Sequence, residues 1–234
     1  MSENQFGIIN GRSTSDALIE LLDFFHFGID NKMFSLAVFI DYQKAFDTVN
    51  RKILLDKLYL YGIRGNAFNL ISSYLTNRSQ FVRINNSYSE SISCNIGVPQ
   101  GTLLSPLLFI LYINDLKNIS QNFSSVLYAD DTTLLFRSNS FENLISTCNR
   151  ELENFRLWSM ANRLSLNVGK THLFFVSNFE MPYLPQIYYG NNILEFASEV
   201  RYLGVLLDNK LKFKNHIQTI CNKISKNTGI IYRL

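Results

Sequence analysis

Ser125-Val126-Leu127-Tyr128-Ala129-Asp130-Asp131-Thr132-Thr133-Leu134-Leu135-Phe136 is the stretch that decides the fold. Two apolar runs flank a short break, Ala-Asp-Asp, a pattern typical of two β-strands joined by a tight turn. Carboxylates fastened to buried strands are costly unless they are paired or bind a metal. The alternative is an ordinary turn, because Asp side chains bond readily to nearby backbone. This stretch alone leaves both interpretations of Asp130 and Asp131 open.

A third carboxylate, Asp41, follows a second apolar run. The run Ser35-Leu36-Ala37-Val38-Phe39-Ile40 favours a strand buried on both faces, although a buried helix can have the same pattern. If this strand lies beside the acidic hairpin, the three carboxylates meet at one edge of a sheet. Three oxygen ligands suit Mg²⁺, and a pair of such ions can promote in-line phosphoryl transfer. For Asp41 alone, a polar residue where a strand reaches solvent is the simpler interpretation.

The composition is that of a soluble globular protein. The chain has 234 residues, of which 47% are hydrophobic and 18% charged, enough for one large domain or two small ones. Its three cysteines are far apart and odd in number, which favours reduced thiols and an intracellular location, nuclear or cytoplasmic. The first residues lack the regions of a secretory signal, and the longest apolar stretch, 103–113, is too short to span a bilayer.

The charge is unevenly distributed along the chain. The net charge is +3, yet none of the 19 acidic residues follows Asp208. Six basic residues do, namely Lys210, Lys212, Lys214, Lys223, Lys226 and Arg233. A basic end of this kind suits a phosphate backbone, and a solvated lysine-rich helix face is the alternative.

Hydrophobic periodicity predicts alternating helices and strands without an internal repeat. Helices are expected at 14–28, 47–61, 66–76, 105–116 and 141–162. Strands are expected at 35–41, 80–84, 92–98 and 172–176, with hairpins at 125–136 and 187–194. Pro182 and Pro185 mark the expected internal boundary. The histidines lack zinc-ligand spacing, and no G-x-S-x-G motif is visible.

Three further residues have side chains suited to nucleotide chemistry. Gln100 lies in the loop 97–102 before a helix start, where glycines allow an anion to approach, although the loop lacks a Walker-type sequence. Lys170, in a turn, could donate a proton to departing pyrophosphate. Phe46, five residues after Asp41, could exclude a ribose 2′-hydroxyl by contact. Each has a simpler interpretation. The loop 97–102 can be an ordinary connection between a strand and a helix, Lys170 can be merely solvated, and Phe46 can be a core residue.

In their order along the chain, the motifs resemble those of reverse transcriptases. Residues 39–47 resemble motif A, 97–106 motif B and 128–131 motif C. The segment 158–171 is similar to motif D through Trp158, Asn162, Leu164, Asn167, Lys170 and Thr171. Residues 202–205 are similar to motif E, the primer grip, and Gln5-Phe6-Gly7 with 11–14 to the finger motif before motif A. Asn114-Asp115-Leu116 and the Lys170-Thr171 pair are most similar to non-LTR (LINE-type) retrotransposon enzymes.

The resemblance implies an α+β polymerase palm, an antiparallel sheet backed by helices. The implied divisions are partial fingers at 1–34, a palm with motifs A to D at 35–180, and the primer-grip hairpin and beginning of a thumb at 181–234. The implied reaction is RNA-templated attack of a primer 3′-hydroxyl on a deoxynucleoside triphosphate, in retrotransposition. RNA template, DNA primer and dNTPs are the implied partners; no membrane is expected, and the oligomeric state is left open.

The resemblance also implies residue roles. Asp41, Asp130 and Asp131 would hold two Mg²⁺ ions, which Mn²⁺ could replace, and Lys170 would be the proton donor. Phe46 would select deoxynucleotides. The remaining implied contacts to nucleotide and primer are those of Gln100, Gly101, Tyr128 and Ala129, with Leu203 and Gly204 in the primer grip.

The chain departs from the family pattern in its extent. Family members have an earlier finger region and a full thumb, so we expect a fragment of a larger element or a shortened copy. Two other functions are open: an inactive relic or nucleic-acid-binding module, and a nucleotidyl cyclase or other palm-type enzyme, since a palm does not fix function. The primer-grip segment argues against the cyclase.

Overall fold

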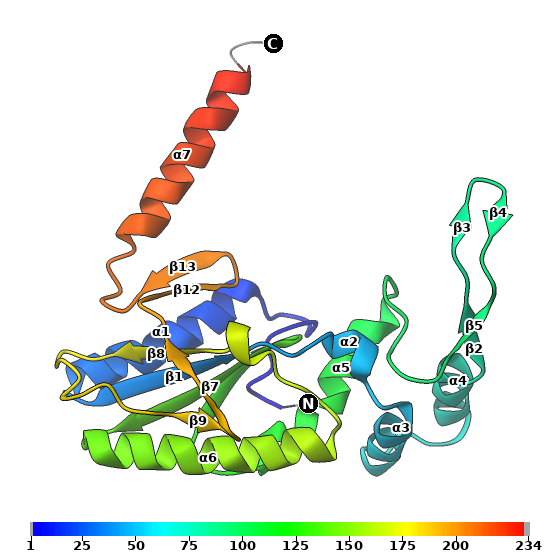
Figure 1. Cartoon of the computed structure of the whole chain (residues 1–234), viewed down its shortest axis with the longest axis horizontal. Helices are drawn as coiled ribbons and strands as arrows, with labels where there is room; N and C mark the ends of the chain where they lie inside the picture. The colour runs from blue at the N-terminus through cyan, green and yellow to red at the C-terminus, as the bar shows by residue number, and fades with distance from the viewer. Residues whose placement is uncertain (1, 232–234) are drawn as a thin grey trace.

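The computed structural model describes residues 2–231 and shows a five-stranded sheet with helices on both faces (Figure 1). The helices are α1 (Thr14–Asp30), α2 (Ala45–Thr48), α3 (Arg51–Leu60), α4 (Gly65–Leu75), α5 (Leu104–Tyr112), α6 (Phe141–Ala161) and α7 (Lys214–Ile231), with 3₁₀ helices η1 (Asn114–Asn118) and η2 (Val168–Lys170). The first seven strands are β1 (Phe34–Ile40), β2 (Arg78–Gln80), β3 (Arg83–Ile84), β4 (Ser87–Tyr88), β5 (Ile92–Cys94), β6 (Ser124–Tyr128) and β7 (Asp131–Ser138). The remaining strands are β8 (His172–Val176), β9 (Tyr188–Tyr189), β10 (Asn192–Ile193), β11 (Glu195–Phe196), β12 (Glu199–Tyr202) and β13 (Val205–Asp208).

Strand β1 is the centre of the sheet, whose order is β11-β8-β1-β7-β6. It runs antiparallel to β7 on one side and to β8 on the other, and β6 and β7 form the expected acidic hairpin. The short edge strand β11 runs parallel to β8. The expected antiparallel sheet backed by helices is therefore confirmed, with one parallel pair at its edge.

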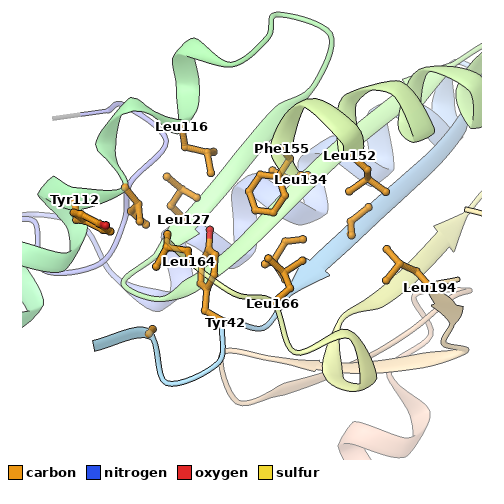
Figure 2. Close-up of a cluster of buried hydrophobic side chains, with 14 of the residues drawn as sticks. Tyr42, Tyr112, Leu116, Leu127, Leu134, Leu152, Phe155, Leu164, Leu166 and Leu194 are labelled. Atoms are coloured by element: carbon orange, nitrogen blue, oxygen red, sulfur yellow. The ribbon is translucent and has the colours of Figure 1, made fainter. Parts of the chain in front are cut away.

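Both faces of β1 are buried, which explains its unbroken apolar sequence. Leu36, Val38 and Ile40 pack into a large cluster with α3, α5 and α6, part of which is shown in Figure 2. The alternate residues Ala37 and Phe39 pack into a second cluster with α1 and the β12–β13 hairpin. Successive strand residues point to opposite faces, so a sheet covered on both sides needs apolar residues at every position.

Helix boundaries follow local capping chemistry. Helix α1 begins after Ser13, whose hydroxyl accepts a hydrogen bond from the Asp16 N–H while the Asp16 carboxylate accepts one from the Ser13 N–H. The helices expected at 14–28, 66–76 and 141–162 are confirmed to within two residues. The helix expected at 105–116 begins one residue earlier, ends at Tyr112 and is followed by η1.

The helix expected at 47–61 is wrong in one respect, because it is two helices. Val49 is not helical, with ψ 121°, and separates α2 from α3. Asn50 then caps α3, its side chain accepting a hydrogen bond from the Ile53 N–H at 3.1 Å.

The strands expected at 80–84 and 92–98 are also wrong in extent. They pair only over Arg78–Gln80 with Ile92–Cys94, and a separate short ladder joins β3 to β4. Beyond Cys94 the backbone N–H groups of Gly97 and Val98 donate to the carbonyls of Val49 and Phe46, at 2.8 and 2.9 Å. These bonds to the α2 segment replace the continued ladder.

Two elements project from the body, the β3–β4 arm at one end and α7 at the other (Figure 1). Helix α7 contains the expected basic residues Lys214, Lys223 and Lys226, all exposed, whereas Arg233 lies outside the described residues. Within the described part of the chain, no helix is long and apolar enough to cross a membrane.

Candidate active site

The acidic hairpin closes in a two-residue turn. Tyr128 and Asp131 form the last pair of the β6–β7 ladder, so Ala129 and Asp130 are the turn residues. Ala129 has φ 53°, in the left-handed region. For a residue with a Cβ this conformation costs roughly 1–2 kcal/mol, so the turn depends on contacts from the surrounding structure.

Asp41 lies next to this turn because of strand register. It follows Ile40, the last residue of β1, which pairs with Thr132 of β7. The Asp41 N–H donates to the Thr171 hydroxyl at 3.2 Å, and its carbonyl accepts from the Asn167 N–H at 2.8 Å. Two residues before β8 thus fix the backbone that carries this carboxylate.

A cavity of about 340 Å³ is lined by both Asp41 and Asp131. Its other walls include Lys170 at the end of η2 and His172 at the start of β8, together with β12, 199–202. The structure therefore brings together two of the three predicted metal ligands and the predicted proton donor, although these three residues come from three separate segments: the end of β1, the start of β7 and η2.

The electrostatics of the site are those of crowded carboxylates. Partial burial, and then the negative charges of Asp130 and Asp41, raise the pKa of Asp131 to about 6 from its ordinary 3.8. Like charges that raise a neighbour's pKa in this way also attract a cation. The donor set of carboxylate oxygens fits Mg²⁺, which is commonly bound through one or two carboxylates plus waters and phosphates.

The expected cluster of three carboxylates is not preformed. Among residues 2–231, no group of three His, Cys, Asp or Glu side chains is arranged to hold a metal ion. Asp130 and Asp131 are both exposed, but only Asp131, which begins β7, lines the cavity. Consecutive residues at a strand end direct their side chains to different sides, which separates the two.

Phe46 and Lys170 occupy different surroundings. Lys170 is exposed at the end of η2 and lines the carboxylate cavity. The half-buried Phe46 ring instead packs against Phe109 of α5, with ring centroids 5.0 Å apart. This packing matches the core alternative, and the selection of deoxynucleotides by Phe46 stays a prediction.

Gln100 lies at a second, larger cavity rather than at the carboxylates, and Gly101 is the next residue in the chain. This cavity, about 700 Å³, is lined by Asp47, Arg51 and the loop residues 97–100. The Gln100 Nε2 donates to the Asp47 carboxylate at 2.8 Å, which joins the predicted motif B loop to the end of motif A. Gly101 has φ 80° and open space where a side chain would be.

The predicted primer-grip residues form the turn of the β12–β13 hairpin. Leu203 and Gly204 have φ 44° and 88°, between the paired residues Tyr202 and Val205. The buried Tyr202 ring lies 5.3 Å from the Phe39 ring of β1. Tyr202 also lines the carboxylate cavity, so this hairpin is close to the site.

Two residues at the site had no assigned role in the sequence analysis. Thr171 is fully buried and holds Asp41. Gln5 is 2% exposed, and its side-chain oxygen accepts a hydrogen bond from the Ala129 N–H of the acidic turn at 3.2 Å. Both stood inside motifs of the resemblance, but no spacing or periodicity indicates contacts across 124 or 130 residues.

The sequence matches a known protein family. Residues 1–207 match the family model described as "Reverse transcriptase (RNA-dependent DNA polymerase)". The chain belongs to the reverse transcriptase family. It is 31% identical over 226 residues to a "Probable RNA-directed DNA polymerase from transposon BS" of Drosophila melanogaster, and 28% over 225 residues to the "RNA-directed DNA polymerase from mobile element jockey" of Drosophila funebris. These alignments cover 93% and 92% of this chain, which spans about a quarter of each relative, 25% and 24%.

Solved structures support the same fold. An apo telomerase from Candida tropicalis superposes with a TM-score of 0.60 at 13% identity, over 90% of this chain and 40% of that one. A telomerase from Candida albicans gives a TM-score of 0.54 at 16% identity, over 88% and 36%. The α+β polymerase palm is therefore confirmed, as is the resemblance to non-LTR retrotransposon enzymes.

Proposed function

We propose that this chain is the catalytic palm of a non-LTR retrotransposon polymerase, acting inside a cell on an RNA template. In this reaction a DNA primer 3′-hydroxyl attacks a dNTP and releases pyrophosphate. The observation that carries the proposal is the cavity in which Asp41, Asp131 and Lys170 meet beside the 128–131 turn. Family membership supplies the reaction class.

Asp41, Asp130 and Asp131 would hold Mg²⁺, or Mn²⁺ in its place. Two such ions, when bound, would lower the pKa of the attacking hydroxyl and stabilise the leaving oxygen. Support comes from the raised pKa of Asp131, because a cation would relieve the repulsion that causes it. Thr171 and Asn167 would hold Asp41 in place through its backbone.

Lys170 would donate a proton to the departing pyrophosphate. Its exposure at the rim of the carboxylate cavity supports this role, because a protonated ammonium there is free to approach a phosphate oxygen. Loss of this lysine would slow the chemical step more than it weakens nucleotide binding.

The substrate contacts are Phe46, Gln100, Gly101, Tyr128 and Ala129, with Leu203 and Gly204 supporting the primer. The position of the 203–204 turn next to the carboxylate cavity supports the primer-grip role. Gln100 would exchange its hydrogen bond with Asp47 for one with the nucleotide. We retain the division into partial fingers (1–34), palm (35–180) and primer grip with the start of a thumb (181–234).

Primer extension on poly(rA)/oligo(dT) with Mg²⁺ tests the proposal. The chain should incorporate dTTP, and Asp130→Asn should abolish incorporation while template-primer binding persists. Incorporation that survives Asp130→Asn would overturn the mechanism. Binding without incorporation by the wild-type chain would instead establish the alternative, a nucleic-acid-binding module without turnover.

A further inference from the structure

We propose that Gln5 is a positioning residue for the metal site, acting through the Ala129–Asp130 turn. The idea rests on the proposed function, because it assumes that this turn carries metal ligands. Gln5 is separated from the turn by more than 120 residues in sequence, yet it is 2% exposed and in direct contact with it.

The segment containing Gln5 is joined to the acidic hairpin by backbone bonds. The Phe6 N–H donates to the Leu127 carbonyl at 2.8 Å, and the Leu127 N–H donates to the Asn4 carbonyl at 2.9 Å. Gln5 and Leu127 thus form a parallel bridge on the side of β6 that faces away from β7. This pairing sets Gln5 two residues short of the turn.

The Gln5 side chain then reaches the turn itself. Its Oε1 accepts hydrogen bonds from the Gly7 N–H at 2.8 Å and from the Ala129 N–H at 3.2 Å. The second bond satisfies the backbone donor of the residue with φ 53°, where the conformation is strained. One carboxamide oxygen therefore holds the turn and the segment opposite it in a single arrangement.

Gly7 shows how closely the two segments are packed. A Cβ at this position would lie 2.4 Å from the Ala129 nitrogen and 3.1 Å from the Tyr128 carbonyl carbon. Both are backbone atoms of the turn, so they cannot move aside without moving Asp130. The turn is thus in contact with this segment on one side and with solvent on the other.

The amide nitrogen of Gln5 allows an effect on the position of the turn to be distinguished from an effect on overall stability. The Gln5 Nε2 is buried and has no hydrogen-bond partner among the described residues. Replacing Gln5 by Met removes this unpaired donor, which favours the fold, and removes the acceptor, which disfavours it. The two effects oppose each other in overall stability, whereas the loss of the Ala129 contact acts on the turn alone.

The test is the midpoint of a Mg²⁺ titration of the folded 234-residue chain, measured by calorimetry at one temperature without substrate, with the Mg²⁺-dependent rise in melting temperature as an independent sign of binding. We expect Gln5→Met to raise this midpoint about 5-fold, the equivalent of one hydrogen bond. Gln5→Glu keeps an acceptor oxygen and should restore a midpoint at or below that of the wild type. Asn4→Ala is the matched control, because the Asn4 side chain donates to the Ser125 hydroxyl at 3.3 Å and not to the turn.

An unchanged midpoint in Gln5→Met, or an equal shift in Asn4→Ala, would overturn the role of Gln5. No Mg²⁺-dependent stabilisation of the wild type would overturn it too, since the site would then bind no metal. If the midpoint shifts as expected while the wild type incorporates no dTTP, the role of Gln5 stands and the proposed polymerase activity fails.

Discussion

At the scale of single residues, Asp131 shows most clearly how this site differs from an ordinary turn. Its pKa is raised to about 6 by partial burial and by the charges of Asp130 and Asp41. The folded state therefore binds its proton more tightly than the unfolded state does. Between pH 3.8 and about 6 the fold loses stability as the pH rises, and above about pH 6 the whole penalty is present.

Asp131→Asn should therefore stabilise the metal-free fold at pH 7. After allowance for the exposure of this side chain, we expect about 1 kcal/mol, which is roughly 2–4 °C in melting temperature. Melting curves in EDTA from pH 4 to pH 7 measure this effect, and the difference should disappear near pH 4. The exposed Asp23→Asn on α1 is the control. A lower melting temperature for Asp131→Asn at pH 7 would mean that the carboxylates do not repel one another.

Local sequence predicts that the three carboxylates lie at strand ends, but it does not predict which residues hold them in place. Asp130 and Asp131 stand at a break between apolar runs, and Asp41 follows another, so the pattern predicts a strand end in each case. The bonds of Thr171 to Asp41 and of Gln5 to Ala129 join distant parts of the chain. Such contacts depend on sheet order and register, which hydrophobic periodicity does not determine.

At the scale of elements, helices and strands were predictable where their burial is regular. The unbroken apolar run predicts β1, and the helical spacing of apolar residues over 141–162 predicts α6. Both predictions are confirmed, because each element packs into the core along its whole length. The prediction of one helix over 47–61 is wrong because Val49 and Asn50, which separate α2 from α3, fit the helical pattern of apolar residues. The Asn50 cap was the available signal for a new helix start.

Gly97 should be essential to the joint between the motif B loop and α2. It has φ 76°, and an added Cβ would lie 2.7 Å from the Asp47 carbonyl oxygen. We expect Gly97→Ala to reduce the free energy of unfolding by about 3 kcal/mol, the sum of backbone strain and displaced contact. Urea denaturation measures the change.

The matched control for Gly97 is Gly62→Ala. Gly62 has φ 92° and open space around its Cα, so only the backbone strain applies and about 1 kcal/mol should be lost. Equal losses for the two variants would show that the contact with Asp47 contributes nothing.

At the scale of the whole molecule, charge and shape act together. Helix α7 extends away from the sheet (Figure 1). Its residues Lys214, Lys223 and Lys226 are exposed. Because α7 packs little against the body, most of its surface is available to a binding partner. Its positive charge suits a nucleic-acid backbone.

Binding of template-primer should weaken steeply with salt and depend on α7. Changing Lys214, Lys223 and Lys226 to Gln should reduce the slope of log affinity against log salt by about 0.7–0.9 for each lysine that contacts a phosphate. Fluorescence anisotropy between 50 and roughly 300 mM salt measures this slope. The control changes the same net charge at exposed Lys32, Lys52 and Lys117. Equal effects of the two triple variants would indicate that net charge, rather than α7, determines binding.

The segment that pairs with Leu127 has a further consequence for the molecule. Strand β6 is the last in its sheet, and an uncovered last strand presents free N–H and C=O groups that can pair with another chain. The bonds from Asn4 and Phe6 cover that border at the point nearest the acidic turn. The same few residues that order the turn thereby prevent edge-to-edge aggregation of the sheet. A chain in which they detach would lose both its solubility and the geometry of the acidic turn.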